Sequence, residues 1–246
     1  MSAIDEALHP AYEDSGKGTF CALSKNQQSD PLDPSGKALG GFSVQMTALY
    51  GAIRPILDGM ERGAVIHFVA ATGGEGTSTI AREFSFMTAT SGHRRTLLVD
   101  GNAASLETAL LFGCPTDRGI VDYVRDGVPY DAALRSLSHA TLTIGALVGV
   151  GAGMHLDAKS VRATYADFRE RYELTVVDCS SITAGLYSQL VPEAADGIVM
   201  VIQAEKVRPV VAQYAKGLVE QAGGNFLGAV LNKRRNYIPE FLYKHL

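Results

Sequence analysis

The most constraining feature of this sequence is a glycine-rich loop between an apolar segment and a helical pattern. The segment VIHFVA (65–70) predicts a buried strand, the next residues read ATGGEGTST (71–79), and a helical pattern extends over 78–91. A strand, a glycine-rich loop and a helix in this order build a phosphate-binding loop, because the helix begins with free backbone N–H groups and a positive dipole end. We therefore predict an anion-binding loop here.

Apolar segments and helical patterns alternate along the rest of the chain. The other predicted strands are TLLVD (96–100), LTIGAL (142–147), LTVVDC (174–179), GIVMVIQ (197–203) and FLGAVLN (226–232). The other predicted helices are 43–58, 157–171 and 207–222. Apolar strands without alternation are typical of a parallel sheet that is buried on both faces. The pattern predicts an α/β fold, with a mostly parallel sheet wound by helices on both faces.

The N-terminal segment differs from the rest in composition. Within residues 1–12, Ile4, Leu8 and Tyr12 recur every four positions, which predicts a short amphipathic helix. Residues 13–42 are rich in Ser, Gly, Pro, Gln and Lys, which is typical of a flexible linker. We therefore expect one domain, at 43–246.

Composition and charge exclude several classes of protein. The 22 basic and 26 acidic side chains give a net charge of −4, so no basic field for nucleic acid is expected. The chain has no apolar run long enough to span a membrane, and MSAIDEALHP is not a signal peptide. Three cysteines without a C-x-x-C pair argue against a disulfide framework or a zinc site. We expect a cytosolic protein.

The loop supplies the candidate phosphate site. Its glycines let the backbone approach an anion closely, and Ser78 stands where such loops carry the hydroxyl that binds Mg²⁺. Thr77 occupies the position of the lysine that normally reaches the β- and γ-phosphates. The candidate phosphate-binding residues are Gly73, Gly74, Gly76, Thr77, Ser78 and Thr79.

Two carboxylates stand at the ends of predicted strands. Asp100 ends the strand after the loop helix, and Asp178 lies near the end of LTVVDC. Ligands of open α/β sheets bind at the carboxyl ends of the strands, where an Asp can act on Mg²⁺. If a Mg-nucleotide binds, the expected metal ligands are Ser78, Asp100 and Asp178.

From about residue 43 to its end, the sequence resembles the bacterial tyrosine kinases (BY-kinases) of exopolysaccharide synthesis. These are P-loop proteins related to the deviant-Walker partition and division-site ATPases. The matching segments, in chain order, are AATGGEGTST, LLVDGNAAS, LLFG, GIVDYVRDG, YELTVVDCSS, ADGIVMVI and GAVLNK. The resemblance implies a P-loop NTPase fold, an adenine contact from Asn232, and a membrane polysaccharide co-polymerase or its kinase as partner.

The sequence departs from the family at the charges that catalysis needs. Thr77 replaces the loop lysine, while Asn102 and Ala104 replace an Asp and an Arg, so that only Asp100 of the second motif stays. Losing one preorganised transition-state donor costs about 3–4 kcal/mol. Phosphoryl transfer depends almost entirely on positioning and charge stabilisation, so we expect Asp100 and Asp178 to be vestigial and no residue to be catalytic.

The family's oligomerisation helix and its tyrosine-rich tail are also reduced. The E-x-x-R-x-x-R positions hold Ala48, Gly51 and Arg54, and the tail keeps only Tyr237 and Tyr243. We therefore expect a monomer or a small oligomer rather than a ring.

These features predict a degenerate kinase that acts as a regulatory or structural cytosolic partner of an exopolysaccharide synthesis or export complex. It would reach the membrane only through a partner, with no cofactor beyond weakly bound ADP or ATP with Mg²⁺. An alternative is an active tyrosine autokinase or ATPase that takes its missing charge from Lys233, an Arg or a partner chain. A division- or partition-type positioning ATPase is a third reading, which Thr72 at the position of a second lysine disfavours.

Overall fold

The structure is a computed structural model. It describes residues 19–24, 44–102, 104–137, 141–149, 157–184 and 191–234. The predicted amphipathic segment, most of the predicted linker, and the two tail tyrosines lie outside the described residues.

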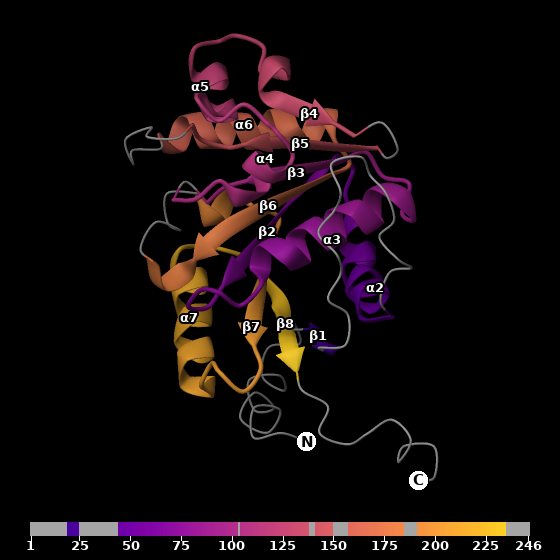
Figure 1. The fold of residues 1–246 in the computed structure, drawn as a ribbon, viewed down its shortest axis with the longest axis vertical. Coiled ribbons are helices and arrows are strands. Elements are labelled where there is room, and N and C mark those ends of the chain that lie inside the picture. Colours follow the sequence, from indigo (N-terminus) through magenta and orange to yellow (C-terminus); the bar gives the residue numbers. More distant parts are fainter. Residues whose placement is uncertain are drawn as a thin grey trace.

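An eight-stranded sheet forms the centre of the fold, in the order β1-β8-β7-β2-β6-β3-β5-β4 (Figure 1). The strands are β1 (Thr19–Ser24), β2 (Ala64–Ala70), β3 (Thr96–Asp100), β4 (Leu134–Ser136), β5 (Leu142–Ala146), β6 (Leu174–Ser181), β7 (Gly197–Gln203) and β8 (Phe226–Arg234). Each neighbouring pair is parallel except β4 with β5. The predicted mostly parallel sheet is confirmed, and each predicted strand is present within a few residues of its expected bounds.

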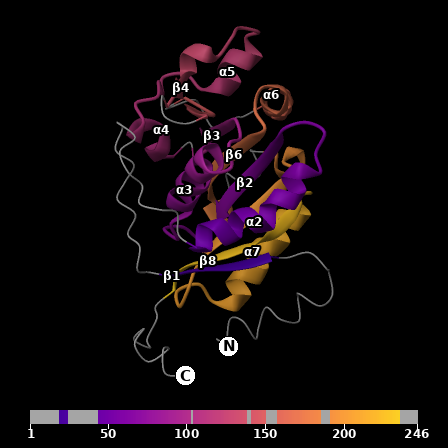
Figure 2. The same ribbon diagram turned by 90° about the vertical axis from the view of Figure 1, so that its right-hand side faces the viewer.

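Helices cover both faces of the sheet, as predicted. They are α2 (Val44–Asp58), α3 (Thr77–Thr90), α4 (Glu107–Leu111), α5 (Ile120–Arg125), α6 (Ala158–Arg171) and α7 (Pro209–Gln221). α2, α3 and α4 pack on one face, with α2 beside α3 (Figure 2), and α5, α6 and α7 pack on the other. Short 3-10 turns occupy Asp131–Ala133, Ile182–Ala184 and Pro192–Ala194. The short helices α4 and α5 and the strand β4 were not predicted.

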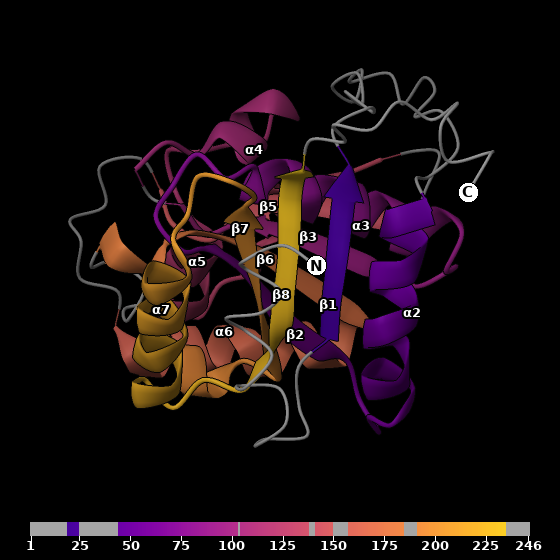
Figure 3. The same cartoon turned by 90° about the horizontal axis from the view of Figure 1, so that it is seen from below.

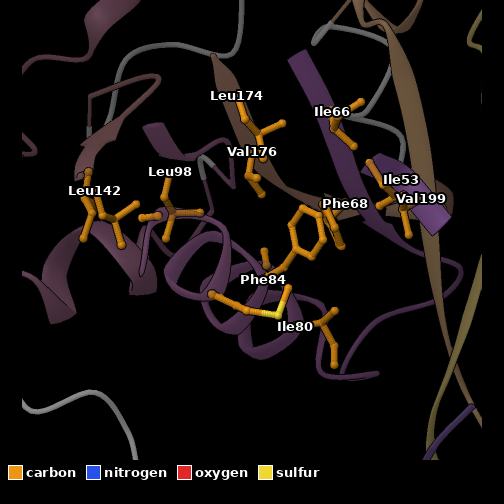
Figure 4. Close-up of a cluster of buried hydrophobic side chains, with 14 of the residues drawn as sticks. Ile53, Ile66, Phe68, Ile80, Phe84, Leu98, Leu142, Leu174, Val176 and Val199 are labelled. Atoms are coloured by element: carbon orange, nitrogen blue, oxygen red, sulfur yellow. The ribbon is translucent and has the colours of Figure 1, made fainter. Parts of the chain in front are cut away.

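Alternate side chains of β2 enter two separate hydrophobic cores. Ile66 and Phe68 pack under α2 and α3, whereas Val65 and Val69 face α6 and α7. The ring of Phe68 lies 5.3 Å from that of Phe84 in α3 (Figure 4). Because β2 is buried along its whole length, the loop that follows it starts from a rigid base.

The linker prediction is wrong for residues 19–24. These six residues form β1, which pairs in parallel with β8 and lies alongside it in Figure 3. Thr and Phe in the segment TFCALS favour strands, and without β1 the β8 edge would present unpaired backbone groups. The domain therefore includes a strand that lies N-terminal to its predicted start at residue 43.

Candidate functional site

The loop between β2 and α3 has the backbone of a glycine-dependent turn. Gly73, Gly74 and Gly76 have φ of 130°, 71° and 88°, in the left-handed region that favours glycine. A Cβ at Gly76 would lie 2.5 Å from Nδ2 of Asn232, so a larger residue here would displace that side chain and would also be strained by the positive φ. The loop ends at the first residue of α3, Thr77, and its N–H groups lie at the positive end of that helix.

Glu75 closes the loop from within. Its carboxylate is fully buried and accepts hydrogen bonds from the Thr72 N–H (3.3 Å) and the Thr72 hydroxyl (3.1 Å). Burial raises the pKa of Glu75, against the hydrogen bonds from Thr72 and the positive charge of Lys206. Thr72, which stands at the position of the second lysine, therefore donates two hydrogen bonds that fix the conformation of the loop.

Asn232 is attached to the loop from β8. Its side-chain Nδ2 donates to the Glu75 carbonyl oxygen at 2.8 Å, and its Oδ1 accepts the Lys233 N–H at 2.8 Å. The resemblance implied an adenine contact for this residue. In this structure the amide ties the end of β8 to the phosphate loop, and the adenine contact stays a prediction.

The first turn of α3 presents three hydroxyl groups with different surroundings. Thr77 Oγ1 is buried and has no hydrogen-bond partner within the described part of the chain. Ser78 lies beside the Asp178 carboxylate and lowers its pKa. Thr79 Oγ1 accepts a 3.4 Å hydrogen bond from the Arg82 guanidinium. Of the three, Thr77 and Ser78 are positioned toward the buried part of the site.

Asp100 and Asp178 are register partners on neighbouring strands β3 and β6. Oδ2 of Asp178 accepts from the Thr108 hydroxyl at 3.0 Å, whereas Oδ1 has no partner among the described residues. Burial, and then the nearby charge of Asp100, raise the pKa of Asp178 to about 7. A buried carboxylate with one free oxygen beside a hydroxyl is suited to a hard cation.

The two oxygens of Asp100 are already used. Oδ1 accepts the Asn102 N–H and Oδ2 the Ala109 N–H, each at 3.0 Å, which fixes the turn that leads into α4. Burial raises the pKa of Asp100. Asn102 donates from Nδ2 to the Ser105 hydroxyl at 3.0 Å, so it caps the same turn. In the described residues, no group of three or more His, Cys, Asp or Glu side chains could hold a metal. Ser78 and the unpaired oxygen of Asp178 would fit Mg²⁺ only together with oxygens of a ligand, because both oxygens of Asp100 already accept backbone N–H groups.

Sequence reasoning missed two residues that complete the site, Arg82 and Thr108. Arg82 Nη1 donates to the Thr108 hydroxyl at 3.3 Å, and Thr108 in turn donates to Asp178. Arg82 stands four residues after Ser78, which places both on one face of α3, and this spacing was a usable signal. Thr108 follows β3 without any recognisable motif, so only the fold identifies it.

Comparison with known proteins identifies the fold. No protein-family model matches the chain. A Staphylococcus aureus protein named "Putative tyrosine-protein kinase CapB" is 27% identical over 165 residues, which cover 64% of this chain and 70% of that protein. The chimerical protein CapA2B2 has a TM-score of 0.75 at 18% identity, covering 93% of this chain and 99% of that one.

Two further solved structures share the architecture. The kinase domain of the Escherichia coli tyrosine kinase ETK has a TM-score of 0.71 at 15% identity, over 92% of this chain and 94% of that chain. A plasmid partition protein of Borrelia burgdorferi bound to AMPPNP has a TM-score of 0.57 at 15% identity, over 76% of this chain and 83% of that chain. The sequence is homologous to that of CapB, and the fold is that of bacterial tyrosine-kinase domains and, more distantly, of the plasmid partition protein.

Proposed function

We propose that this chain is a catalytically degenerate relative of the bacterial tyrosine kinases. It binds Mg-nucleotide weakly and acts as a regulatory partner in an exopolysaccharide synthesis or export complex. The observation that carries the proposal is Thr77, a neutral residue, 6% exposed, at the lysine position of an otherwise well-formed phosphate loop. A loop of this shape holds phosphate through backbone N–H groups, but a neutral side chain adds no charge to a transition state.

Several groups support nucleotide binding. The three loop glycines keep the conformation that a phosphate cradle needs, and Ser78 lies beside a buried Asp178 with one unpartnered oxygen. A bound Mg²⁺ would supply positive charge between this pair and the phosphates. The partition protein of the same fold was solved with AMPPNP bound, which supports nucleotide binding by a chain of this fold.

The remaining charges argue against phosphoryl transfer. Asn102 is held in a turn by Ser105, and Ala104 provides no guanidinium. Each missing transition-state donor typically costs about 3–4 kcal/mol, and phosphoryl transfer relies on such donors almost completely. Binding without turnover is therefore the use of this site that its residues support.

The regulatory role rests on the similarity to CapB and to the CapA2B2 chimera, whose name joins a CapA part to a CapB part. The resemblance implies that the partner is a membrane co-polymerase or a kinase bound to one. No helix in the described ranges is long and apolar enough to cross a membrane. In the proposed complex, the partner recruits this chain to the membrane.

A specific observation favours a second candidate, an active autokinase or ATPase. Lys233 Nζ lies 2.8 Å from the Gly74 carbonyl oxygen, so a positive side chain does reach the loop. This candidate requires that Lys233 replace the loop lysine in turnover as well as in binding. It predicts ATP hydrolysis or phosphotyrosine, and the degenerate kinase predicts neither.

Calorimetric titration of the full chain with ADP, with and without Mg²⁺, tests the binding part of the proposal. We expect a Kd in the millimolar range with Mg²⁺, equivalent to about −4 kcal/mol, and weaker binding without it. Ser78→Ala should remove the Mg²⁺ dependence and keep the Mg²⁺-free affinity, because the backbone contacts stay. No binding at millimolar ADP would contradict the proposal.

A further inference from the structure

The end of β8 carries an ammonium group onto the phosphate loop. Lys233 has a left-handed backbone, with φ of 58°, and its Nζ donates to the Gly74 carbonyl oxygen at 2.8 Å. The pairing of β1 with β8 shifts register across Asn232 and Lys233, so β8 contains one residue more than β1 in this interval. An extra residue of this kind bends the strand and re-aims its side chains. The bend lies at Asn232 and Lys233, whose side chains contact the loop.

A second ammonium group approaches the same place from the turn after β7. Lys206 Nζ lies 3.9 Å from the position that a Cβ on Gly74 would occupy. Among the described residues, no ion pair within 4.0 Å joins Lys206 or Lys233 to a carboxylate. The loop therefore lies close to two ammonium groups, of which Lys206 acts on the buried Glu75 carboxylate through its charge without forming an ion pair with it.

The inner side of the loop holds polar atoms that also lack a partner. Within the described residues, Thr77 Oγ1 and Asp178 Oδ1 are unpaired, and their residues are 6% and 1% exposed. Buried polar atoms in native proteins nearly always have a partner. Two such atoms without one, at the start of α3 and in β6, therefore indicate a site for a ligand. The donors, the acceptor and the two ammonium groups suit an anionic phosphate with a bound cation.

We propose that Lys233 is the phosphate-binding cation of this loop, supplied from β8 in place of the lysine that Thr77 replaces. The inference rests on the proposed nucleotide binding and assigns Lys233 to the β-phosphate of a nucleoside di- or triphosphate. An ammonium group has three N–H donors, of which the Gly74 carbonyl uses one. Two donors and the full charge are left for phosphate oxygens.

Titration calorimetry with Mg-ADP on matched variants tests this role. Lys233→Met should weaken binding by about 10- to 100-fold, the range for a lost hydrogen bond to a charged group. Lys216→Met is the control, because Lys216 pairs with Glu220 at 3.5 Å and contacts Phe226 at the opposite end of β8. Its affinity should equal that of the wild type, and thermal unfolding should show that both variants are folded.

Lys233→Gln removes the charge but keeps an N–H donor, on a side chain that is one bond shorter, so it separates the charge from hydrogen bonding. If the charge binds phosphate, Lys233→Gln should bind ADP as weakly as Lys233→Met. Adding Thr77→Lys to the Lys233→Met variant should restore affinity to within about threefold of the wild type, since a hydrogen bond to a charged group is regained.

The outcomes separate this inference from the proposed function. If the wild type binds ADP and both Lys233→Met and Lys233→Gln bind it equally well, the role of Lys233 is overturned and the proposed nucleotide binding stands. Wild-type affinity in Lys233→Gln alone would show that Lys233 only shapes the loop, which also overturns the inference. Absence of binding by the wild type would instead refute the proposed function.

Discussion

At the scale of single residues, the site contains a buried acid that is only partly compensated by its neighbours. Asp178 is 1% exposed, one of its oxygens has no partner in the described chain, and Asp100 adds a second carboxylate in register with it. Burial of a carboxylate disfavours its charged form, and a nearby acid adds to the effect. Below about pH 7 a proton on Asp178 avoids the cost of burying its charge, and a bound cation would offset that cost when the carboxylate is ionised.

The pH dependence of stability tests this description of Asp178. Its pKa is raised from 3.8 to about 7, so between these values the folded protein keeps a proton that the unfolded chain releases. The free energy of unfolding therefore falls as pH rises through this window. Asp178→Asn should be more stable than the wild type at pH 8, by on the order of 1–3 kcal/mol, and should match it near pH 4.

Urea unfolding at the two pH values measures this difference. Asp117→Asn is a suitable control, because Asp117 is an exposed carboxylate and its loss should change stability little at either pH. If Asp178→Asn were equally or less stable than the wild type at pH 8, the carboxylate would have a partner that the description lacks.

The sequence predicted the loop and both aspartates, because each belongs to a local pattern next to an apolar strand. It did not predict the role of Glu75, whose buried carboxylate closes the loop on Thr72. A charged residue in a glycine-rich turn normally points to solvent, and only the packed structure shows that this one is buried. Local pattern therefore finds the phosphate cradle but not the side chains that hold its shape.

At the scale of elements, β1 is the largest difference from expectation. The segment TFCALS lies between stretches of linker-like composition, and six residues are too few for a strong periodic signal. Its pairing with β8 depends on a strand that lies far along the chain, so sequence-local reasoning could not anticipate it. The same pairing borders the bend that presents Asn232 and Lys233 to the loop.

Two truncations test the role of β1. Removing residues 1–24 deletes the strand and exposes the edge of β8, whereas removing residues 1–12 leaves it in place. The longer deletion should lower Tm by several degrees, since about 1 kcal/mol shifts Tm by 2–4 °C in a chain of this size. It should also weaken Mg-ADP binding, and the shorter deletion should change neither. Equal behaviour of both truncations in calorimetry would show that β1 does not position β8.

Helix α2 carries the positions where the resembling kinases place their ring contacts. Ala48 and Gly51 are exposed and uncharged, and Arg54 is paired with Asp58 of the same helix at 3.1 Å. Gly51 also weakens the helix by about 1 kcal/mol relative to Ala. Light scattering at micromolar concentration should therefore report a monomer or small oligomer. A particle with the mass of a closed ring would show that another surface assembles it.

At the scale of the whole molecule, the parallel sheet gathers the site from distant parts of the chain. The carboxyl ends of the parallel strands β2, β3, β6 and β8 lie on the same side of the sheet. This arrangement brings together the loop, Asp100, Asp178 and Lys233. The sequence predicted these strands and their parallel arrangement, because apolar runs between helices allow little else. The order of strands in the sheet cannot be read from such runs, since each is equally apolar and buried.

The most direct test of binding without turnover is a single-turnover experiment with γ-labelled ATP. The full chain, at millimolar concentration and in excess, is mixed with Mg-ATP. The reaction is quenched after minutes to hours, and the nucleotide and the protein are analysed for the label. We expect the nucleotide to be recovered as ATP, with no label on Tyr237, Tyr243 or any other residue. Conversion of bound ATP to ADP above the rate without protein, or label on either tyrosine, would contradict a degenerate kinase and favour an active enzyme that uses Lys233.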